Sequence, residues 1–184
     1  MNPANKITLS RILLIPVFVV LFYRLEPNSP LPGLVFILAS LTDFVDGRLA
    51  RSRNLVTTFG KFIDPLADKI LTQTAFILLV ETGKIRAWIV IIILSRELII
   101  TAFRTLAASK NIIIAASNWG KFKTASQMAC LILFLLKPYM VKALSFPENE
   151  ILSPIMLYLA LILTIISGID YILKNKKILD LDNI

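Results

Sequence analysis

Long apolar stretches dominate the pattern of hydrophobic and polar positions along the chain. Six of them follow one another, separated by short segments rich in charged residues, proline or glycine. A helix of about 20 apolar residues spans the hydrocarbon core of a bilayer, so the pattern predicts six membrane-spanning helices. One such stretch is compatible with a buried helix of a soluble protein, but six in 184 residues are not. The stretches are Ile7–Tyr23, Leu31–Arg51, Thr57–Val80, Ile85–Ser109, Trp119–Leu136 and Ile151–Leu173.

The overall composition supports this interpretation. Hydrophobic residues make up 57% of the chain and the mean hydropathy is +0.77, which is more apolar than a typical soluble domain. The first stretch lacks the small-residue cleavage pattern of a signal peptide. We therefore expect one all-α domain over residues 1–184, a polytopic six-transmembrane-helix bundle that ends in a short cytoplasmic tail over residues 174–184.

Basic residues indicate how such a bundle is oriented. If the N-terminus lies inside, 14 of the 20 Lys and Arg residues fall at inner ends, five fall at outer ends, and Arg96 lies within the fourth stretch. Cytoplasmic loops carry an excess of basic residues, so we expect a multi-pass protein of the cell membrane whose acidic cluster, described next, faces the cytoplasm. The net charge of +8 then reflects topology and anionic lipids, and no nucleic-acid partner is expected.

Four of the twelve acidic residues lie on the second and third stretches, close to the short polar link between them. Asp43 and Asp46 are spaced i, i+3, and Asp64 and Asp68 are spaced i, i+4, so each pair shares a face if its segment is helical. Antiparallel packing across the link would bring the four carboxylates together. A bare cluster of this kind repels itself, whereas oxygen ligands without His or Cys favour Mg²⁺, Mn²⁺ or Ca²⁺. We therefore predict a site for two divalent cations.

Small residues near the aspartates and the absence of histidine limit the reaction mechanisms that this site could support. Gly47, Ala50 and Gly60 lie near the aspartates; such residues commonly serve helix packing in membranes, but beside four aligned acids we interpret them as making room for a ligand. The chain contains no histidine and no Walker-type phosphate loop, which excludes Ser-His-Asp and Cys-His mechanisms. Metal-assisted transfer at phosphorus remains.

The acidic and small residues together form a longer pattern. Residues 43–68 match D-x-x-D-G-x-x-A-R-x8-G-x-x-x-D-x-x-x-D at every position, and this run resembles the signature of the CDP-alcohol phosphatidyltransferase family. The resemblance implies a membrane enzyme of phospholipid biosynthesis that transfers the phosphatidyl group of CDP-diacylglycerol to an alcohol and releases CMP. It also implies two Mg²⁺ or Mn²⁺ ions per active site and a homodimer.

The same resemblance assigns roles to the residues of the signature. All four aspartates would be metal ligands, and Asp68 would also accept the proton of the acceptor hydroxyl. Arg51 would grip the diphosphate through its planar guanidinium, and the three small residues would leave space for the cytidine. The metal ligands are therefore expected to be Asp43, Asp46, Asp64 and Asp68, and the CDP-lipid contacts in the signature Gly47, Ala50, Arg51 and Gly60.

Basic residues outside the signature indicate an anion pocket. Arg104, Lys110, Lys121 and Lys123 flank the inner loop between the fourth and fifth stretches. Each is also explained as a positive-inside anchor, but together with backbone amides at the start of the fifth helix they suit an acceptor that carries a phosphate.

Further segments resemble one branch of the family, the bacterial phosphatidylglycerophosphate synthases. By this resemblance the acceptor is sn-glycerol 3-phosphate, Asn5 and Thr8 contact the CDP-lipid, and Arg11 joins the acceptor-phosphate residues. The segments that carry the likeness are residues 5–11, 64–69, 95–97, 104–109 and 120–124.

Alternative functions stay open on these grounds. The same chemistry with inositol phosphate, serine or phosphatidylglycerol as the acceptor needs the same signature. A divalent-cation transporter also places carboxylates within membrane helices, yet near the midplane and with broken helices or repeats, which this chain does not show. A non-catalytic scaffold needs neither the acids nor Arg51. Arg96 and Glu97, within the fourth stretch, are expected to contact other helices rather than chiefly each other, because neighbouring residues on a helix point about 100° apart.

Overall fold

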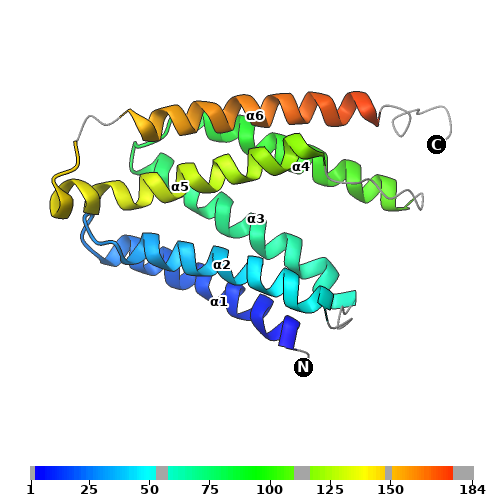
Figure 1. Ribbon diagram of the computed structural model, residues 1–184, viewed down its shortest axis with the longest axis horizontal. Helices are drawn as coiled ribbons and strands as arrows, with labels where there is room; N and C mark the ends of the chain where they lie inside the picture. Colours follow the sequence, from blue (N-terminus) through cyan, green and yellow to red (C-terminus); the bar gives the residue numbers. More distant parts are fainter. Residues whose placement is uncertain (1–2, 53–57, 110–116, 148–150, 176–184) are drawn as a thin grey trace. The chain divides into compact units, whose positions relative to one another are not determined.

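A computed structural model describes residues 3–52, 58–109, 117–147 and 151–175, with side chains over 12–41, 69–108, 117–147 and 151–175. Over these residues the fold is all-helical, without strands, as the sequence predicts. Each predicted stretch corresponds to one helix (Figure 1). The helices are α1 (Pro3–Arg24), α2 (Leu31–Ser52), α3 (Thr58–Glu81), α4 (Ala87–Ser109), α5 (Asn118–Leu144) and α6 (Leu152–Lys174).

Helix α5 differs most from its prediction. The apolar stretch ends at Leu136, but the helix continues through Pro138 and Lys142 to Leu144. Apolar length measures how much of a helix suits hydrocarbon and not where the helical backbone ends. A helix that extends beyond the apolar stretch, even one that contains a proline, is therefore missed by that criterion.

The chain packs as two compact units. The first combines Met1–Glu81 with Leu131–Glu150, and the second combines Thr82–Cys130 with Ile151–Ile184. Helix α5 thus contributes its second half to the first unit and its first half to the second.

The first unit is built around the helices α1, α2 and α3. Helix α1 packs against both others, and α2 contacts α3; α1 and α3 run in one direction and α2 runs in the opposite one (Figure 1). The core between them contains an aromatic pair. The rings of Phe18 on α1 and Phe36 on α2 are fully buried, and their centroids lie 5.9 Å apart. Such ring pairs add about 0.5–1.5 kcal/mol beyond the area they bury. Phe76 and Leu79 contribute the buried face of α3.

Polar contacts link the helix ends of this unit on the side opposite the signature. The Tyr23 hydroxyl at the end of α1 donates a hydrogen bond to Glu81 at the end of α3. The Lys142 ammonium on α5 lies 3.7 Å from a carboxylate oxygen of Glu26. Both groups of this second pair are well exposed, so it stabilises the fold little.

The second unit is held by α4 and α6, which pack against each other and run in the same direction (Figure 1). The buried face of α6 repeats at intervals of three and four residues and is rich in small and hydroxyl side chains. It consists of Ser153, Leu157, Ala160, Leu161, Thr164, Ser167, Gly168 and Tyr171. Its opposite face exposes large apolar residues such as Ile155, Ile162 and Ile169, as expected for a helix that faces lipid.

Helices α5 and α6 are long and apolar enough to cross a membrane, judged by length and composition over the described residues. Shorter apolar segments cover Ile12–Arg24 and Leu31–Leu41, while α4 carries Arg96, Glu97 and Arg104 within its length. Membrane spanning by the remaining four helices stays a prediction from the sequence.

A close approach of α5 to α2 yields a test of the packing in the first unit. A Cβ atom at Gly33 would lie 2.5 Å from a methyl carbon of Leu136. We expect Gly33→Val to lower the free energy of unfolding by about 1–3 kcal/mol through overpacking, measured by thermal unfolding in detergent. Leu136→Ala, added to it, removes the clash, so the double variant should lose less than the sum of the single losses.

The matched control is Gly120→Val, also at the third position of its helix. Among the described residues a Cβ there would meet the Ser117 hydroxyl, at an ordinary 3.5 Å, and valine has a better helix propensity than glycine, so the change should be close to neutral. Equal losses at Gly33 and Gly120, or strictly additive losses at Gly33 and Leu136, would contradict the packing described for α2 and α5.

Candidate functional site

The structure confirms that both parts of the acidic pattern lie on helices. Asp43 and Asp46 lie in the last ten residues of α2, and Asp64 and Asp68 lie in the first eleven of α3. The two helices run in opposite directions (Figure 1) and contact each other, and only residues 53–57 separate them in the chain. The backbone therefore places both segments at the ends of α2 and α3 that this link joins.

Helical geometry then fixes which positions share a face. At about 100° per residue, Asp43, Asp46, Gly47 and Ala50 fall along one side of α2, and Gly60, Asp64 and Asp68 follow one line along α3. The side chains of these residues, and that of Arg51, lie outside the described residues. Convergence of the four carboxylates stays a prediction. The donor set itself, carboxylate oxygens alone in a chain without histidine, suits hard divalent cations.

Helix α1 carries the residues predicted near the amino end. Asn5, Thr8 and Arg11 are spaced i, i+3, i+6 on α1, so they lie on one face. Their side chains also lie outside the described residues. Because α1 packs against both α2 and α3, the helix that carries them neighbours both signature helices.

Three of the basic residues predicted for the acceptor phosphate are described, all in the second unit. Arg104 lies near the end of α4 and is exposed, and Lys121 is exposed in the first turns of α5. Lys123, by contrast, is 4% exposed and its ammonium forms an ion pair with Glu97 on α4. Lys110 lies outside the described residues. Arg104 and Lys121 therefore present their charge outward, while that of Lys123 is directed into the unit.

The start of α5 is partly capped by its own chain. The Ser117 hydroxyl accepts a hydrogen bond from the amide of Gly120 at 3.1 Å, and the Ser117 carbonyl accepts one from the amide of Lys121 at 3.3 Å. A serine that precedes a helix and bonds the amide of its third residue is an N-cap. The expectation of free amides at this helix start is therefore wrong for these two, and the charge of Lys121 is the main attraction for an anion here.

Glu97 and Arg96 each find a partner on another helix, as predicted. The Glu97 carboxylate pairs with Lys123 of α5, and an Arg96 amino group donates to the Ser167 hydroxyl of α6 at 2.9 Å. Their direct contact is looser, with 3.6 Å between Arg96 Nη1 and Glu97 Oε1. If α4 spans the membrane as the sequence predicts, each charge within it costs about 2.5–3.5 kcal/mol on insertion scales, and these partners would offset that cost.

A second polar contact extends this cluster, which consists of Arg96, Glu97, Lys123 and Ser167. The Gln127 side-chain amide on α5 donates to the Thr164 hydroxyl on α6 at 3.1 Å, and that hydroxyl donates to the Ala160 carbonyl at 2.6 Å. Both side chains are buried. With the contacts of Arg96 and Glu97, these bonds tie together α4, the first half of α5, and α6.

Sequence reasoning overlooked the α6 side of this cluster. Thr164, Ser167 and Tyr171 recur every three or four residues in the most apolar helix of the chain. Polar residues at that spacing indicate one polar stripe on an otherwise lipid-compatible helix, and this signal was available from the sequence.

The family model and the related proteins that match this chain are all described as phosphatidyltransferases or phosphatidylglycerophosphate synthases. A family model described as CDP-alcohol phosphatidyltransferase matches residues 1–166. A Bacillus subtilis (strain 168) protein named CDP-diacylglycerol–glycerol-3-phosphate 3-phosphatidyltransferase is 42% identical over 99% of this chain and 99% of its own. A Haemophilus influenzae protein of the same name is 42% identical over 97% of this chain and 95% of its own. A Mycobacterium tuberculosis protein named probable phosphatidylglycerophosphate synthase is 38% identical over 96% and 82% respectively.

The ion pair in the second unit yields a test of the cluster. Among the described residues, Lys123→Met leaves the mostly buried Glu97 carboxylate with the looser Arg96 contact. We therefore expect a loss of unfolding free energy approaching the roughly 3–5 kcal/mol seen when one partner of a buried pair is removed. Adding Glu97→Gln removes the unpaired charge and should restore part of the loss. Thermal unfolding of the purified protein in detergent measures both effects.

Lys121→Met serves as the control, since Lys121 lies two residues away on the same helix and is exposed. Its substitution should change the unfolding free energy by no more than about 0.5 kcal/mol. A Lys123→Met protein as stable as this control, or a double variant less stable than Lys123→Met, would show that the ion pair does not hold the unit together.

Proposed function

The chain belongs to the CDP-alcohol phosphatidyltransferase family, and from this premise we propose that it transfers the phosphatidyl group of CDP-diacylglycerol to sn-glycerol 3-phosphate. The products are phosphatidylglycerophosphate and CMP, and the role is in phosphatidylglycerol biosynthesis. The observation that carries the transferase chemistry is the complete signature on the joined ends of α2 and α3. The acceptor rests on relatives whose names include glycerol 3-phosphate and which match nearly the whole chain.

The proposed reaction is a displacement at the phosphatidyl phosphorus. The primary hydroxyl oxygen of glycerol 3-phosphate forms a new bond to that phosphorus, the bond to the CMP oxygen breaks, and CMP leaves with the bonding electrons. The hydroxyl proton passes to Asp68. With no histidine in the chain, a carboxylate is the residue type that suits this general-base role.

Divalent ions fit the donor set of the signature, and the family is generally dependent on such metals. We assign Asp43, Asp46, Asp64 and Asp68 as the residues that would hold two Mg²⁺ or Mn²⁺ ions. When bound, such ions offset the negative charge of the diphosphate and of the departing CMP.

Other residues of the first unit bind the donor in this proposal. The Arg51 guanidinium donates paired hydrogen bonds to the diphosphate, and Gly47, Ala50 and Gly60 give the cytidine access to the backbone. Asn5 and Thr8 contribute polar contacts from α1.

The acceptor phosphate is assigned to the basic residues outside the signature. Arg104 and Lys121 are supported by their exposure, and Arg104 is preferred because a planar guanidinium binds a phosphate through two parallel hydrogen bonds. The full set proposed is Arg11, Arg104, Lys110, Lys121 and Lys123. For Lys123 the role requires exchange of its Glu97 partner for the phosphate.

We also propose the cellular setting that the charge pattern predicts. Two membrane-compatible helices, α5 and α6, and a family of membrane enzymes indicate a membrane protein. Six spans, an active site that faces the cytoplasm and a homodimer are the finer proposals. A cytoplasmic site suits the chemistry, because the water-soluble acceptor and CMP then enter and leave on the side where nucleotides are available.

An assay of CMP release tests the function directly. With purified protein in mixed micelles, release from CDP-diacylglycerol should require both Mg²⁺ or Mn²⁺ and added glycerol 3-phosphate. Asp68→Asn should lower turnover by at least about 100-fold, within the range of general acid–base catalysis, while thermal unfolding shows that the protein is folded. Equal CMP release with inositol phosphate or serine in place of glycerol 3-phosphate would refute the acceptor, and near-normal turnover of Asp68→Asn would remove Asp68 as the base.

The acceptor site has its own variant. Arg104→Ala should raise the KM for glycerol 3-phosphate by roughly 10- to 100-fold, as expected for the loss of charged hydrogen bonds, with the KM for CDP-diacylglycerol little changed. Steady-state rates with one substrate varied and the other saturating separate the two constants. An unaltered KM for glycerol 3-phosphate would move the phosphate site away from Arg104.

A further inference from the structure

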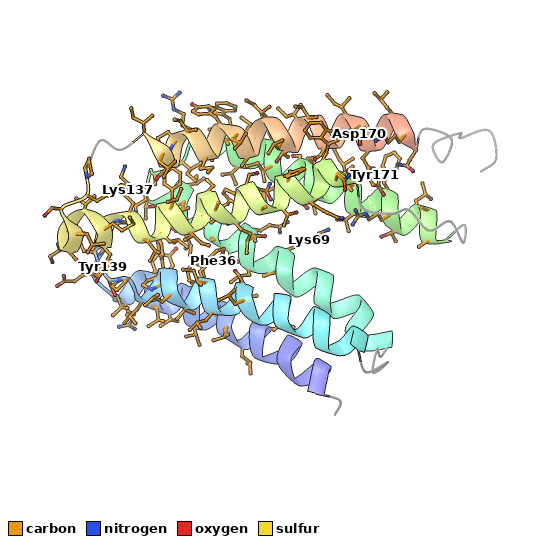
Figure 2. All side chains as sticks on the ribbon, in the orientation of Figure 1. Phe36, Lys69, Lys137, Tyr139, Asp170 and Tyr171 are labelled. Carbon is orange, nitrogen blue, oxygen red and sulfur yellow. The ribbon has the colours of Figure 1, made fainter. Side chains whose placement is uncertain are left out.

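Tyr171, near the end of α6, makes contacts that the proposed function does not use. Only 3% of it is exposed, and its ring lies against two consecutive residues of α4. The Phe103 ring meets it edge-on, with 6.4 Å between centroids, and the Arg104 guanidinium carbon lies 5.6 Å from the centre of the Tyr171 ring. Figure 2 shows Tyr171 on α6, next to Asp170.

The contact with Arg104 is a cation–π interaction. A guanidinium within about 6 Å of an aromatic centroid is attracted by the ring face. Arg104 is itself exposed, and an arginine side chain carries about 2 kcal/mol of rotamer entropy. Within the part of the chain that the structure describes, the Tyr171 ring restrains it. The ring, which is buried and packed against Phe103, gives the guanidinium a fixed surface.

Arg96 adds a reason for holding Arg104 in place. The Arg96 guanidinium donates to the Ser167 hydroxyl, one helical turn before Tyr171 on the buried face of α6, so Arg96 and Arg104 both contact this face of α6. Two guanidinium groups brought near each other repel, and the positive potential that results favours an anion. Without the ring, Arg104 would be free to turn away from Arg96.

We infer that Tyr171 is a positioning residue for the acceptor: its ring holds the Arg104 guanidinium ready for the phosphate of glycerol 3-phosphate. The inference rests on the proposed function. Tyr171 lies outside residues 1–166, the part that the family model matches, but within the 99% of the chain covered by the relative named for glycerol 3-phosphate.

The ring and the hydroxyl are separable. The Tyr171 hydroxyl is buried and has no hydrogen-bond partner among the described residues. Removal of a buried polar group that lacks a partner is close to neutral for stability. Tyr171→Phe therefore keeps the ring face and is the conservative variant, whereas Tyr171→Met fills a similar space with a flexible side chain and has no ring face.

The test compares these variants in the CMP-release assay. Tyr171→Met should raise the KM for glycerol 3-phosphate about two- to fivefold, the range of an exposed cation–π contact, with kcat and the KM for CDP-diacylglycerol within about twofold of the unsubstituted protein. Tyr171→Phe should leave all three constants near their original values. In an Arg104→Ala background, Tyr171→Met should cause no further rise in the KM for glycerol 3-phosphate, because the group it holds is gone.

The outcomes separate the inference from the function on which it rests. If Arg104→Ala leaves the KM for glycerol 3-phosphate unchanged, the acceptor site of the proposed function fails. If Arg104→Ala raises that constant and Tyr171→Met does not, the positioning role alone fails. A rise with Tyr171→Phe equal to that with Tyr171→Met would also overturn it, as would equal changes in both KM values. Should Tyr171→Met not fold, Tyr171→Leu replaces it, with the intact KM for CDP-diacylglycerol as the criterion of folding.

Discussion

The ion pair between Glu97 and Lys123 shows the constraint on which this molecule depends. A charged side chain on an apolar helix is tolerated only where a group of opposite charge or a hydrogen-bond partner pairs with it. The pair joins α4 to the first half of α5, and the Arg96–Ser167 hydrogen bond joins α4 to α6. In lipid, apolar packing alone gives little specificity to helix association, because lipid tails are as apolar as leucine side chains. Polar contacts therefore select the register in which α4 and α6 meet.

Small residues make these contacts possible. A Cβ atom at Gly168 would lie 3.1 Å from Cγ of Arg96, closer than an ordinary van der Waals contact, so glycine lets the arginine stem lie flat against α6. Its neighbour Ser167 accepts the hydrogen bond from the guanidinium. Space and a polar partner thus come from consecutive residues. The same logic applies at the signature, where small residues accompany the aspartates, but there the answering charge is proposed to come from metal ions rather than from lysine.

The sequence predicted the helices well because each depends mainly on local apolar length. All six appear within a few residues of their predicted bounds, except at the end of α5. The family was also predictable, since the signature is a pattern of residue types at fixed spacing that needs no knowledge of packing. The partner of Glu97 could not be predicted from the sequence. Lys123 is 26 residues away on another helix, and which faces meet depends on tertiary packing that leaves no local period in the sequence. The sequence predicts Lys123 only as a residue for the acceptor phosphate, because a lysine near an inner helix end has the same local pattern whether it faces water or a buried carboxylate.

The signature residues and the residues proposed for the acceptor lie on different helices, and this separation suggests how members of one family can use different acceptors. The signature lies on α2 and α3 and is proposed to bind the CDP group that all donors share, so a single fixed ligand would constrain its residues. The acceptor phosphate is instead proposed to bind mainly residues of α4 and α5. Of these, Arg104 lies against the Tyr171 ring of α6, a helix that carries no signature residue. Arg104 is useful for phosphate only if its guanidinium is held in place, and Tyr171 is the described residue whose ring contacts it. A change of acceptor would then require altered side chains on α4, α5 and α6, while the aspartates of α2 and α3 stay as they are.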